Sequence, residues 1–288
     1  MSNSFDADVI IGGGGLVGQT LALALDQAGL SVVVVDAAKP ADTLAPTFDG
    51  RAFAIAFASY RMWRALGVAD ELDKTAAPIR EIMVTDGELE RGPSLLHLHF
   101  DGAEQRDPDE PLGLMCEARY VRAALDKAVK AKPSIRMIQP MSVKAIARDS
   151  ASVTATLADG STLRAPLLVG ADGRRSFVRE AIGVRTIGWD YPVTAIVATI
   201  QHEKPHGGVA HEYFLPNGPF AILPLKGERA NIVWAEPRKA AEVLLKMPEA
   251  DFLAELRMRG GDHLGSLSLE GPRFGCPLSL QMAERMMD

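Results

Sequence analysis

Hydrophobic and polar positions near the N-terminus predict a strand, a helix and a second strand. Residues 9–11 form a short apolar run, and residues 15–28 carry apolar side chains at helical spacing before Gly29, a residue type that commonly follows the last turn of a helix. The stretch "SVVVVDA", residues 31–37, is β-branched and apolar at consecutive positions, as buried parallel strands are. The pattern therefore predicts a βαβ unit.

The rest of the chain alternates between helical and strand-like patterns, which indicates an α/β protein. In order, the pattern predicts a helix over 51–66, short strands within 82–100, a surface loop at 101–111, a helix over 117–131, a hairpin over 152–165 with its turn at Asp159–Gly160, a strand, glycine turn and short helix within 166–184, strands separated by turns over 190–235, and a helix over 238–257 before an irregular end.

Composition narrows the class of protein. The 288 residues carry a formal net charge of −6, which argues against nucleic-acid binding because phosphate contacts need clustered lysine and arginine. No apolar run approaches the roughly 20 residues of a membrane-spanning helix, and the first residues lack the basic and apolar regions of a signal peptide. Cys116 and Cys276 form no CxxC pattern. We therefore expect a reduced, cytoplasmic chain without a structural disulfide or a zinc site.

Three glycines, Gly13, Gly15 and Gly18, fit the spacing G-x-G-x-x-G between the first strand and the helix. In that place the first glycine permits a tight turn, the second lets the backbone approach a pyrophosphate, and the third allows close helix–strand packing. Asp36 ends the second strand, where a carboxylate accepts hydrogen bonds from a ribose diol and repels a 2′-phosphate. The loop predicts dinucleotide binding and disfavours NADP at this site. It leaves NAD and FAD open.

A second strand–glycine element, "LLVGADGRRSFVRE", lies at residues 167–180. Its glycines permit a sharp turn, Asp172 can accept hydrogen bonds from sugar hydroxyls, and the arginines that follow add positive potential for phosphate. A plain surface turn is the alternative reading of this motif alone. An NAD-dependent Rossmann dehydrogenase would instead continue after Asp36 with further short βαβ units, which this sequence lacks.

Taken in order, the motifs resemble those of the FAD-dependent aromatic-ring hydroxylases, the class A flavoprotein monooxygenases, and within them the branch that hydroxylates ubiquinone precursors. The matching stretches run from residue 8 to the C-terminus: "DVIIGGGGLVGQTLALAL", "VVVVD", "DGRAFAIAFAS", "LLVGADGRRSFVREAIGV", "HEYFLPNGPFAILPL", "IVWA" and "PLSLQMAER". The first motif is weak by itself, and the ordered set is specific.

The resemblance implies roles for individual residues. Gly13, Gly15 and Gly18 would hold the FAD pyrophosphate, and Asp36 would hold the adenosine ribose. The other implied cofactor residues are Arg51, on the flavin side, Arg119, by a looser match, and Asp172 with Gly173, in a motif that serves both FAD and NAD(P)H. A solvated arginine on a helix face is the alternative for Arg51 and Arg119.

The same resemblance implies an activity and a domain plan. NAD(P)H would reduce FAD, and O₂ would then supply an oxygen atom to a phenolic, polyprenylated ubiquinone precursor. The implied fold is a Rossmann-like FAD-binding domain of three layers, with an inserted, mainly antiparallel β-sheet substrate domain. In this plan residues 1–80 and 117–186 form the FAD domain, and residues 81–116 and 187–272 form the substrate domain. Residues 273–288 are the start of the chain's return to the FAD domain.

Because the cofactor carries the chemistry, we expect neither a Ser-His-Asp set nor a carboxylate pair, and we predict no separate catalytic residue. The histidines at 97, 99, 202, 206 and 211 lack convincing metal-ligand spacing, so we expect no metal. We predict that the strands at 191–235 wall the substrate pocket, with Phe220 and Ile222 on one strand face.

One family motif is missing from the sequence. The family continues beyond "PLSLQ" into a strand and a "GDAAH" motif that contacts the flavin, and no such motif occurs among the 288 residues. We therefore expect a C-terminally truncated chain whose activity is open. Two alternatives stay beside hydroxylation: an FAD-linked reductase or dehydrogenase of the same fold, and an inactive fragment that acts as a partner in a pathway complex. A lipophilic substrate would imply a peripheral contact with the inner face of the membrane.

Overall fold

The computed structural model describes residues 5–44, 50–88, 92–104, 107 and 110–288. Its central layer is a parallel sheet in the order β12-β1-β2-β8. The strands are β1 (Val9–Gly12), β2 (Val32–Val35), β8 (Ile135–Ile138) and β12 (Leu167–Gly170). Both β1 and β2 are buried along their whole length, because the sheet is covered on both faces.

Helices cover one face of this sheet and a small sheet covers the other. Ile11 and Val34 pack against α1 (Leu16–Gln27) and α5 (Ala118–Lys130). Their neighbours Ile10 and Val33 pack against the antiparallel strands β9 (Val143–Arg148), β10 (Val153–Leu157) and β11 (Thr162–Ala165). Alternate side chains of a strand point to opposite faces, so these strands join two apolar cores. The predicted three-layer, Rossmann-like arrangement is confirmed.

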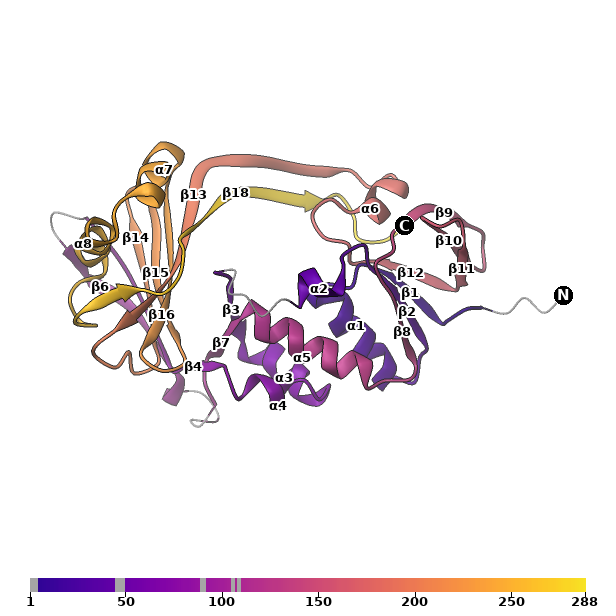
Figure 1. Cartoon of the computed structure of the whole chain (residues 1–288), viewed down its shortest axis with the longest axis horizontal. Helices are drawn as coiled ribbons and strands as arrows, with labels where there is room; N and C mark the ends of the chain where they lie inside the picture. Colours follow the sequence, from indigo (N-terminus) through magenta and orange to yellow (C-terminus); the bar gives the residue numbers. More distant parts are fainter. Residues whose placement is uncertain (1–4, 45–49, 89–91, 105–106, 108–109) are drawn as a thin grey trace.

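A second, larger sheet runs in the order β17-β13-β16-β15-β14-β5-β6, with β18 paired to β13. Its strands are β5 (Glu81–Glu88), β6 (Gly92–Asp101), β13 (Thr186–His202), β14 (Val209–Leu215), β15 (Gly218–Leu225), β16 (Arg229–Pro237), β17 (Leu267–Leu269) and β18 (Phe274–Ala283). The helices α7 (Arg238–Lys246) and α8 (Glu249–Gly260) contribute the side chains that pack on one face, around Phe220 and Trp234. In Figure 1, α8 lies on the side of this sheet away from α1 and α5.

The opposite face of the large sheet meets a three-stranded sheet of β3 (Ala52–Ala56), β7 (Gly113–Glu117) and β4 (Ala77–Ile79). Ile79 and Met115 from the small sheet pack against Ala210 and Leu225 from the large one. Outside this contact, β13 and β18 form a two-stranded ribbon that bridges to α6 (Phe177–Ala181) (Figure 1). The short helices are α2 (Pro40–Thr43), α3 (Phe57–Ala65), α4 (Ala69–Leu72) and η1 (Gly102–Glu104).

Most predicted elements are present. The βαβ unit, the helix over 117–131 and the strands within 82–100 and 190–235 are confirmed. The predicted hairpin is also confirmed, with Gly160 at φ +87° in its turn. In the predicted loop at 101–111, Asp101 still belongs to β6 and η1 follows it, while residues 105, 106, 108 and 109 lie outside the described ranges. No helix within the described ranges is long and apolar enough to cross a membrane.

Three predictions were wrong. The helix over 51–66 begins only at Phe57, because residues 52–56 pair antiparallel with β7, and this pairing overrides the helix propensity of an alanine-rich segment. The single helix over 238–257 is two helices, since Met247 precedes a proline and is extended. The end is not irregular, because β17 and β18 both pair with β13. The predicted domain boundaries stay a prediction, and β7 pairs with β3 and β4 rather than with the large sheet.

Candidate functional site

The two glycine loops lie in direct backbone contact at the carboxyl ends of neighbouring strands. Gly13 has φ +108°, and a Cβ on it would lie 2.3 Å from the Ala171 carbonyl oxygen and 2.6 Å from the Asp172 nitrogen. The Ala171 N–H donates to the Gly12 carbonyl oxygen over 2.7 Å. Only glycine is compatible with position 13, because its φ is positive and because a Cβ there would clash with the second loop.

Gly18 and Gly15 differ in what surrounds them. A Cβ on Gly18 would lie 1.9 Å from the Gly13 carbonyl oxygen, so this glycine lets α1 approach the loop. A Cβ on Gly15 would meet no atom of the described residues within 4 Å. Gly15 is also the N-cap of α1, whose first turn has no acidic side chain and no side-chain cap. The first N–H groups of α1 and its dipole therefore favour an anion over Gly15.

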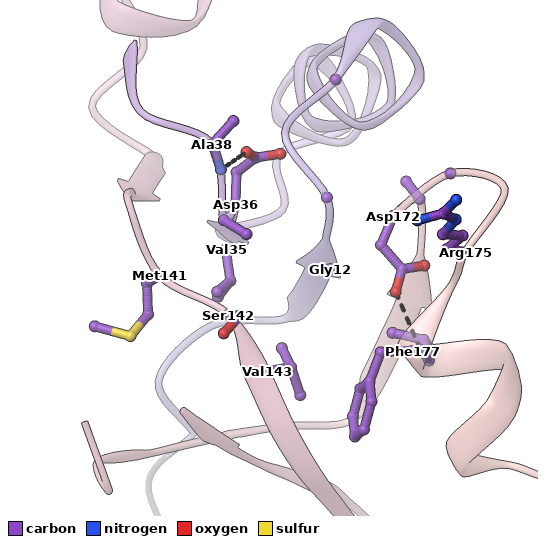
Figure 2. A pocket seen from close by; sticks show the side chains of 16 residues that line it. Gly12, Val35, Asp36, Ala38, Met141, Ser142, Val143, Asp172, Arg175 and Phe177 are labelled. Carbon is purple, nitrogen blue, oxygen red and sulfur yellow. Dashed lines mark hydrogen bonds between the residues drawn. The ribbon is translucent and has the colours of Figure 1, made fainter. Parts of the chain in front are cut away.

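Asp36 is held by backbone groups on three sides, as Figure 2 shows in part. Its carboxylate accepts from the Gly14 N–H and, over 2.7 Å, from the Ala38 N–H. Its own carbonyl oxygen accepts from the Met141 N–H over 2.7 Å. The carboxylate is thereby fixed at the carboxyl end of β2, beside the first glycine loop.

Asp172 occupies the matching place after β12, so the two aspartates lie on either side of the end of β1, at Gly12 (Figure 2). One oxygen of Asp172, Oδ2, accepts from the Val178 N–H over 3.1 Å. The other, Oδ1, is buried and has no hydrogen-bond partner within the described part of the chain. A buried acceptor without a donor is costly, and a hydroxyl group of a ligand would satisfy it.

A pocket of about 470 Å³ joins the two loops. It is lined by Gly12, Gly13, Gly15, Val35, Asp36, Ala37, Ala38, Met141, Ser142, Val143, Ala171, Asp172, Gly173, Arg175, Phe177 and Val178. Of the arginines after the second loop, Arg175 lines it, while Arg174 donates to Ser279 and Arg179 donates to the Arg174 carbonyl. The Met141–Val143 wall was missed from the sequence, because these three residues, at the start of β9 and just before it, carry no glycine and no charge.

Arg51 and Arg119 lie together, away from this pocket. The Arg51 carbonyl oxygen accepts from the Ala118 N–H over 2.9 Å, where α5 begins. The Arg119 guanidinium forms an ion pair with Glu117 at 2.7 Å and lies over the ring of Tyr120. The structure thus brings both predicted arginines to the junction of β3, β7 and α5.

Glu117 at this junction was not found by sequence reasoning. Its side chain is only 4% exposed and also pairs with Arg229 of β16 at 2.9 Å. Arg229 in turn forms two hydrogen bonds to Glu270, of 2.6 and 2.7 Å. Beside them, the Asn231 amide donates to the carbonyl oxygens of Gly50, at 3.4 Å, and Ala198, at 3.2 Å. These polar links hold the large sheet against the segment that carries Arg51.

The structure corrects the prediction for Phe220 and Ile222. Phe220 is fully buried, and its ring lies 5.9 Å from that of Trp234. Ile222 is 3% exposed and belongs to the same core, under α7 and α8. Both side chains therefore lie on the helix-covered face of β15. Ala221 and Leu223, one position away from these residues, point to the other face of β15.

Comparison with known proteins places the chain in a family. Residues 6–264 match the model of the FAD binding domain family. The chain is 48% identical over 284 residues to a ubiquinone hydroxylase, UbiL, of Rhodospirillum rubrum, covering 98% of this chain and 64% of the relative. It is 33% identical over 260 residues to the 3-demethoxyubiquinol 3-hydroxylase of Escherichia coli, covering 90% of this chain and 64% of the relative. The chain thus spans less than two thirds of each of these relatives.

Solved structures share the fold. A crystal structure of PqsL from Pseudomonas aeruginosa, described as a probable FAD-dependent monooxygenase, matches with a TM-score of 0.76 at 21% identity, over 94% of this chain and 73% of the other. A ternary complex of aklavinone-11 hydroxylase with FAD and aklavinone matches with a TM-score of 0.68 at 22% identity, over 99% of this chain and 56% of the other. From the family match across residues 6–264, we conclude that this chain belongs to the FAD binding domain family.

Proposed function

We propose that the chain serves an FAD-dependent monooxygenase that hydroxylates the aromatic ring of a phenolic, polyprenylated quinone precursor, with NAD(P)H and O₂ as co-substrates. The observation that carries this proposal is the 48% identity to a ubiquinone hydroxylase over 98% of the chain. A substrate with a polyprenyl tail partitions into lipid, so the proposal extends to a peripheral membrane contact and to association with other proteins of the pathway.

The residues of the two loops fit FAD. The space over Gly15, which no atom of the described ranges fills, suits a pyrophosphate, and the buried Asp172 Oδ1, which has no donor among the same residues, suits a sugar hydroxyl. In the proposal Gly13, Gly15 and Gly18 hold the pyrophosphate, Asp36 holds the adenosine ribose, and Asp172 with Gly173 contacts the cofactor from the second loop. When bound, FAD supplies the redox chemistry, taking reducing equivalents from NAD(P)H and activating O₂.

Residues outside the two glycine loops would orient the flavin and exclude water from the substrate. Arg51 and Arg119 would place positive charge beside the flavin half of the cofactor, and Glu117 fixes Arg119. The face of the large sheet opposite α7 and α8 would form an apolar wall for the substrate, which excludes water from the reacting ring.

Oxygen-isotope incorporation tests the proposal. The FAD-loaded protein is supplied with NADH or NADPH, a prenylated phenol and ¹⁸O₂, and the product is analysed by mass spectrometry. We expect one labelled oxygen atom per hydroxylated ring, with NAD(P)H consumption that depends on the phenol. Oxidation of NAD(P)H with a reduced organic product and no need for O₂ would instead identify a reductase and contradict the proposal.

A further inference from the structure

Glu212 is a single carboxylate in a row of apolar side chains across the large sheet. The row follows the strand register: Leu98 pairs with Val84, Val84 with Glu212, Glu212 with Ala221, Ala221 with Val233, Val233 with Val197, and Val197 with Phe274. The intervening residues Ile196, Ile222 and Trp234 belong to the core under α7 and α8. Because side chains alternate between faces, the Glu212 row points to the face that looks toward the FAD-binding layers.

The row lies beside the segment that carries Arg51. Phe274, at its end, is so close to Gly50 that a Cβ on Gly50 would lie 2.2 Å from the Phe274 ring. The next row along the strands includes Ala210, Leu223 and Asn231. There, Asn231 donates to the Gly50 carbonyl oxygen, and Ala210 packs against the β3-β7-β4 sheet. The Glu212 row is therefore the first one beyond the contact between the two sheets.

No interaction with a described residue accounts for the position of Glu212. Its carboxylate makes no hydrogen bond or ion pair with any described residue, and Asp86 of the neighbouring strand β5, which pairs with Phe214, is exposed. Burial raises the pKa of Glu212 above its usual value, and no charged group among the described residues contributes to the shift. A partly buried carboxylate without a partner opposes folding when it is ionised.

We infer that Glu212 accepts the hydrogen bond of a hydroxyl group on the substrate ring and then takes its proton, an assignment that rests on the proposed function. In this step the ring O–H bond breaks, a new O–H bond forms at a Glu212 Oε atom, and the electron pair stays on the ring oxygen. A carboxylate and a phenol become a carboxylic acid and a phenolate. The phenolate ring is richer in electrons and so more reactive toward oxygen transfer, and the proton returns to the product.

The stability of a Glu212→Leu variant separates this role from a structural one. Because the pKa of Glu212 is raised in the folded state, folding favours the protonated side chain. Its contribution to the free energy of unfolding is therefore fully present at low pH and is lost as the pH rises through the folded-state pKa. We expect Glu212→Leu to have a higher Tm than the wild type at pH 8, and we expect the difference to become smaller as the pH is lowered. A lower Tm at pH 8 would show that the carboxylate stabilises the fold.

Ligand binding tests the inference directly. Binding of 2-allylphenol and of its methyl ether, 2-allylanisole, is measured by titration calorimetry at pH 8 with the FAD-loaded protein. Wild type should prefer the phenol by about tenfold, the size of a hydrogen bond to a charged group, and Glu212→Leu should bind both alike. The matched control is Glu242→Leu, an exposed glutamate of α7, which should keep the wild-type preference. A wild-type preference below about twofold, with or without hydroxylation, would overturn the inference.

The pH profile of hydroxylation supplies a second readout. Wild-type kcat/KM should fall as the pH drops through the Glu212 pKa, because only the ionised carboxylate accepts the proton. Glu212→Gln keeps a hydrogen-bond acceptor but cannot act as a base, so it should lose this acidic limb. An unchanged limb in Glu212→Gln would overturn the proton transfer. Wild type that prefers the phenol but never hydroxylates it would refute the proposed function while leaving the Glu212 contact in place.

Discussion

Replacing Gly18 with alanine is expected to destabilise the nucleotide-binding layers and to abolish FAD binding. The new Cβ would lie 1.9 Å from the Gly13 carbonyl oxygen. Because this neighbour is backbone, no side-chain rotation relieves the clash, and α1 must move away from β1. Overpacking of this kind costs about 1–3 kcal/mol or more. The free energy of unfolding, measured in urea without FAD, should therefore fall by at least that amount.

Gly15→Ala is the matched control for Gly18→Ala. Its Cβ would meet no atom within 4 Å in the part of the chain that the structure describes, and the backbone at Gly15 is extended, with φ −72°. We expect unfolding without FAD to be unchanged, because nothing in the protein is displaced. Retention of FAD should fall sharply, since the methyl group enters the space that we assign to the pyrophosphate. Equal stability of Gly18→Ala and wild type, or undiminished FAD retention by Gly15→Ala, would contradict the assigned geometry.

Removal of the Glu117 side chain is expected to have the second largest effect. Glu117 is almost fully buried and forms ion pairs with Arg119 and Arg229. Glu117→Ala leaves both guanidinium groups without this carboxylate, and loss of one partner of a buried pair typically costs about 3–5 kcal/mol. Since Arg229 lies on β16 and Glu117 is the last residue of β7, the large sheet should also become less firmly attached to the FAD-binding layers.

An exposed ion pair provides the comparison for Glu117→Ala. Glu71 pairs with Lys127 at 2.6 Å on the surface, and such pairs add little to stability, so Glu71→Ala should unfold like the wild type. In the double variant Glu117→Leu with Arg229→Leu, part of the loss should be recovered, because both members of this buried pair are absent, while Glu270 and Arg119 each lose one partner. If Glu117→Ala unfolds at the same urea concentration as Glu71→Ala, Glu117 does not link the two sheets.

Elements set by local pattern could be predicted from the sequence, and elements set by distant pairing could not. The first strand, the helix after it and the valine-rich strand follow from apolar spacing alone, and the structure confirms them. Residues 52–56 look helical because alanine dominates, yet they pair with β7 more than fifty residues away. Strand β18 likewise forms because it pairs with β13, and the sequence of residues 274–283 alone does not predict that pairing.

The candidate site divides in the same way. The glycine loop and Asp36 could be located from the sequence, because the turn, the helix start and the strand end that they occupy all belong to one βαβ unit. Phe220 and Ile222 were placed on the wrong face, since a shift of one residue along a strand exchanges its two faces and the sequence does not show which face the helices cover. Glu117 and Glu212 were missed. For Glu212 a signal existed, because in "VAHEYFL" the glutamate alternates in register with Ala210 and Phe214.

The visible absorption of the purified chain tests the central claim, that the two glycine loops build an FAD site. The 288-residue protein is incubated with excess FAD and freed of unbound cofactor. Its spectrum is then compared with that of Gly15→Ala. We predict retained flavin absorption at about one FAD per chain, as a single specific site implies, and little flavin on Gly15→Ala. A wild-type chain that is folded by circular dichroism but stays colourless would contradict the claim.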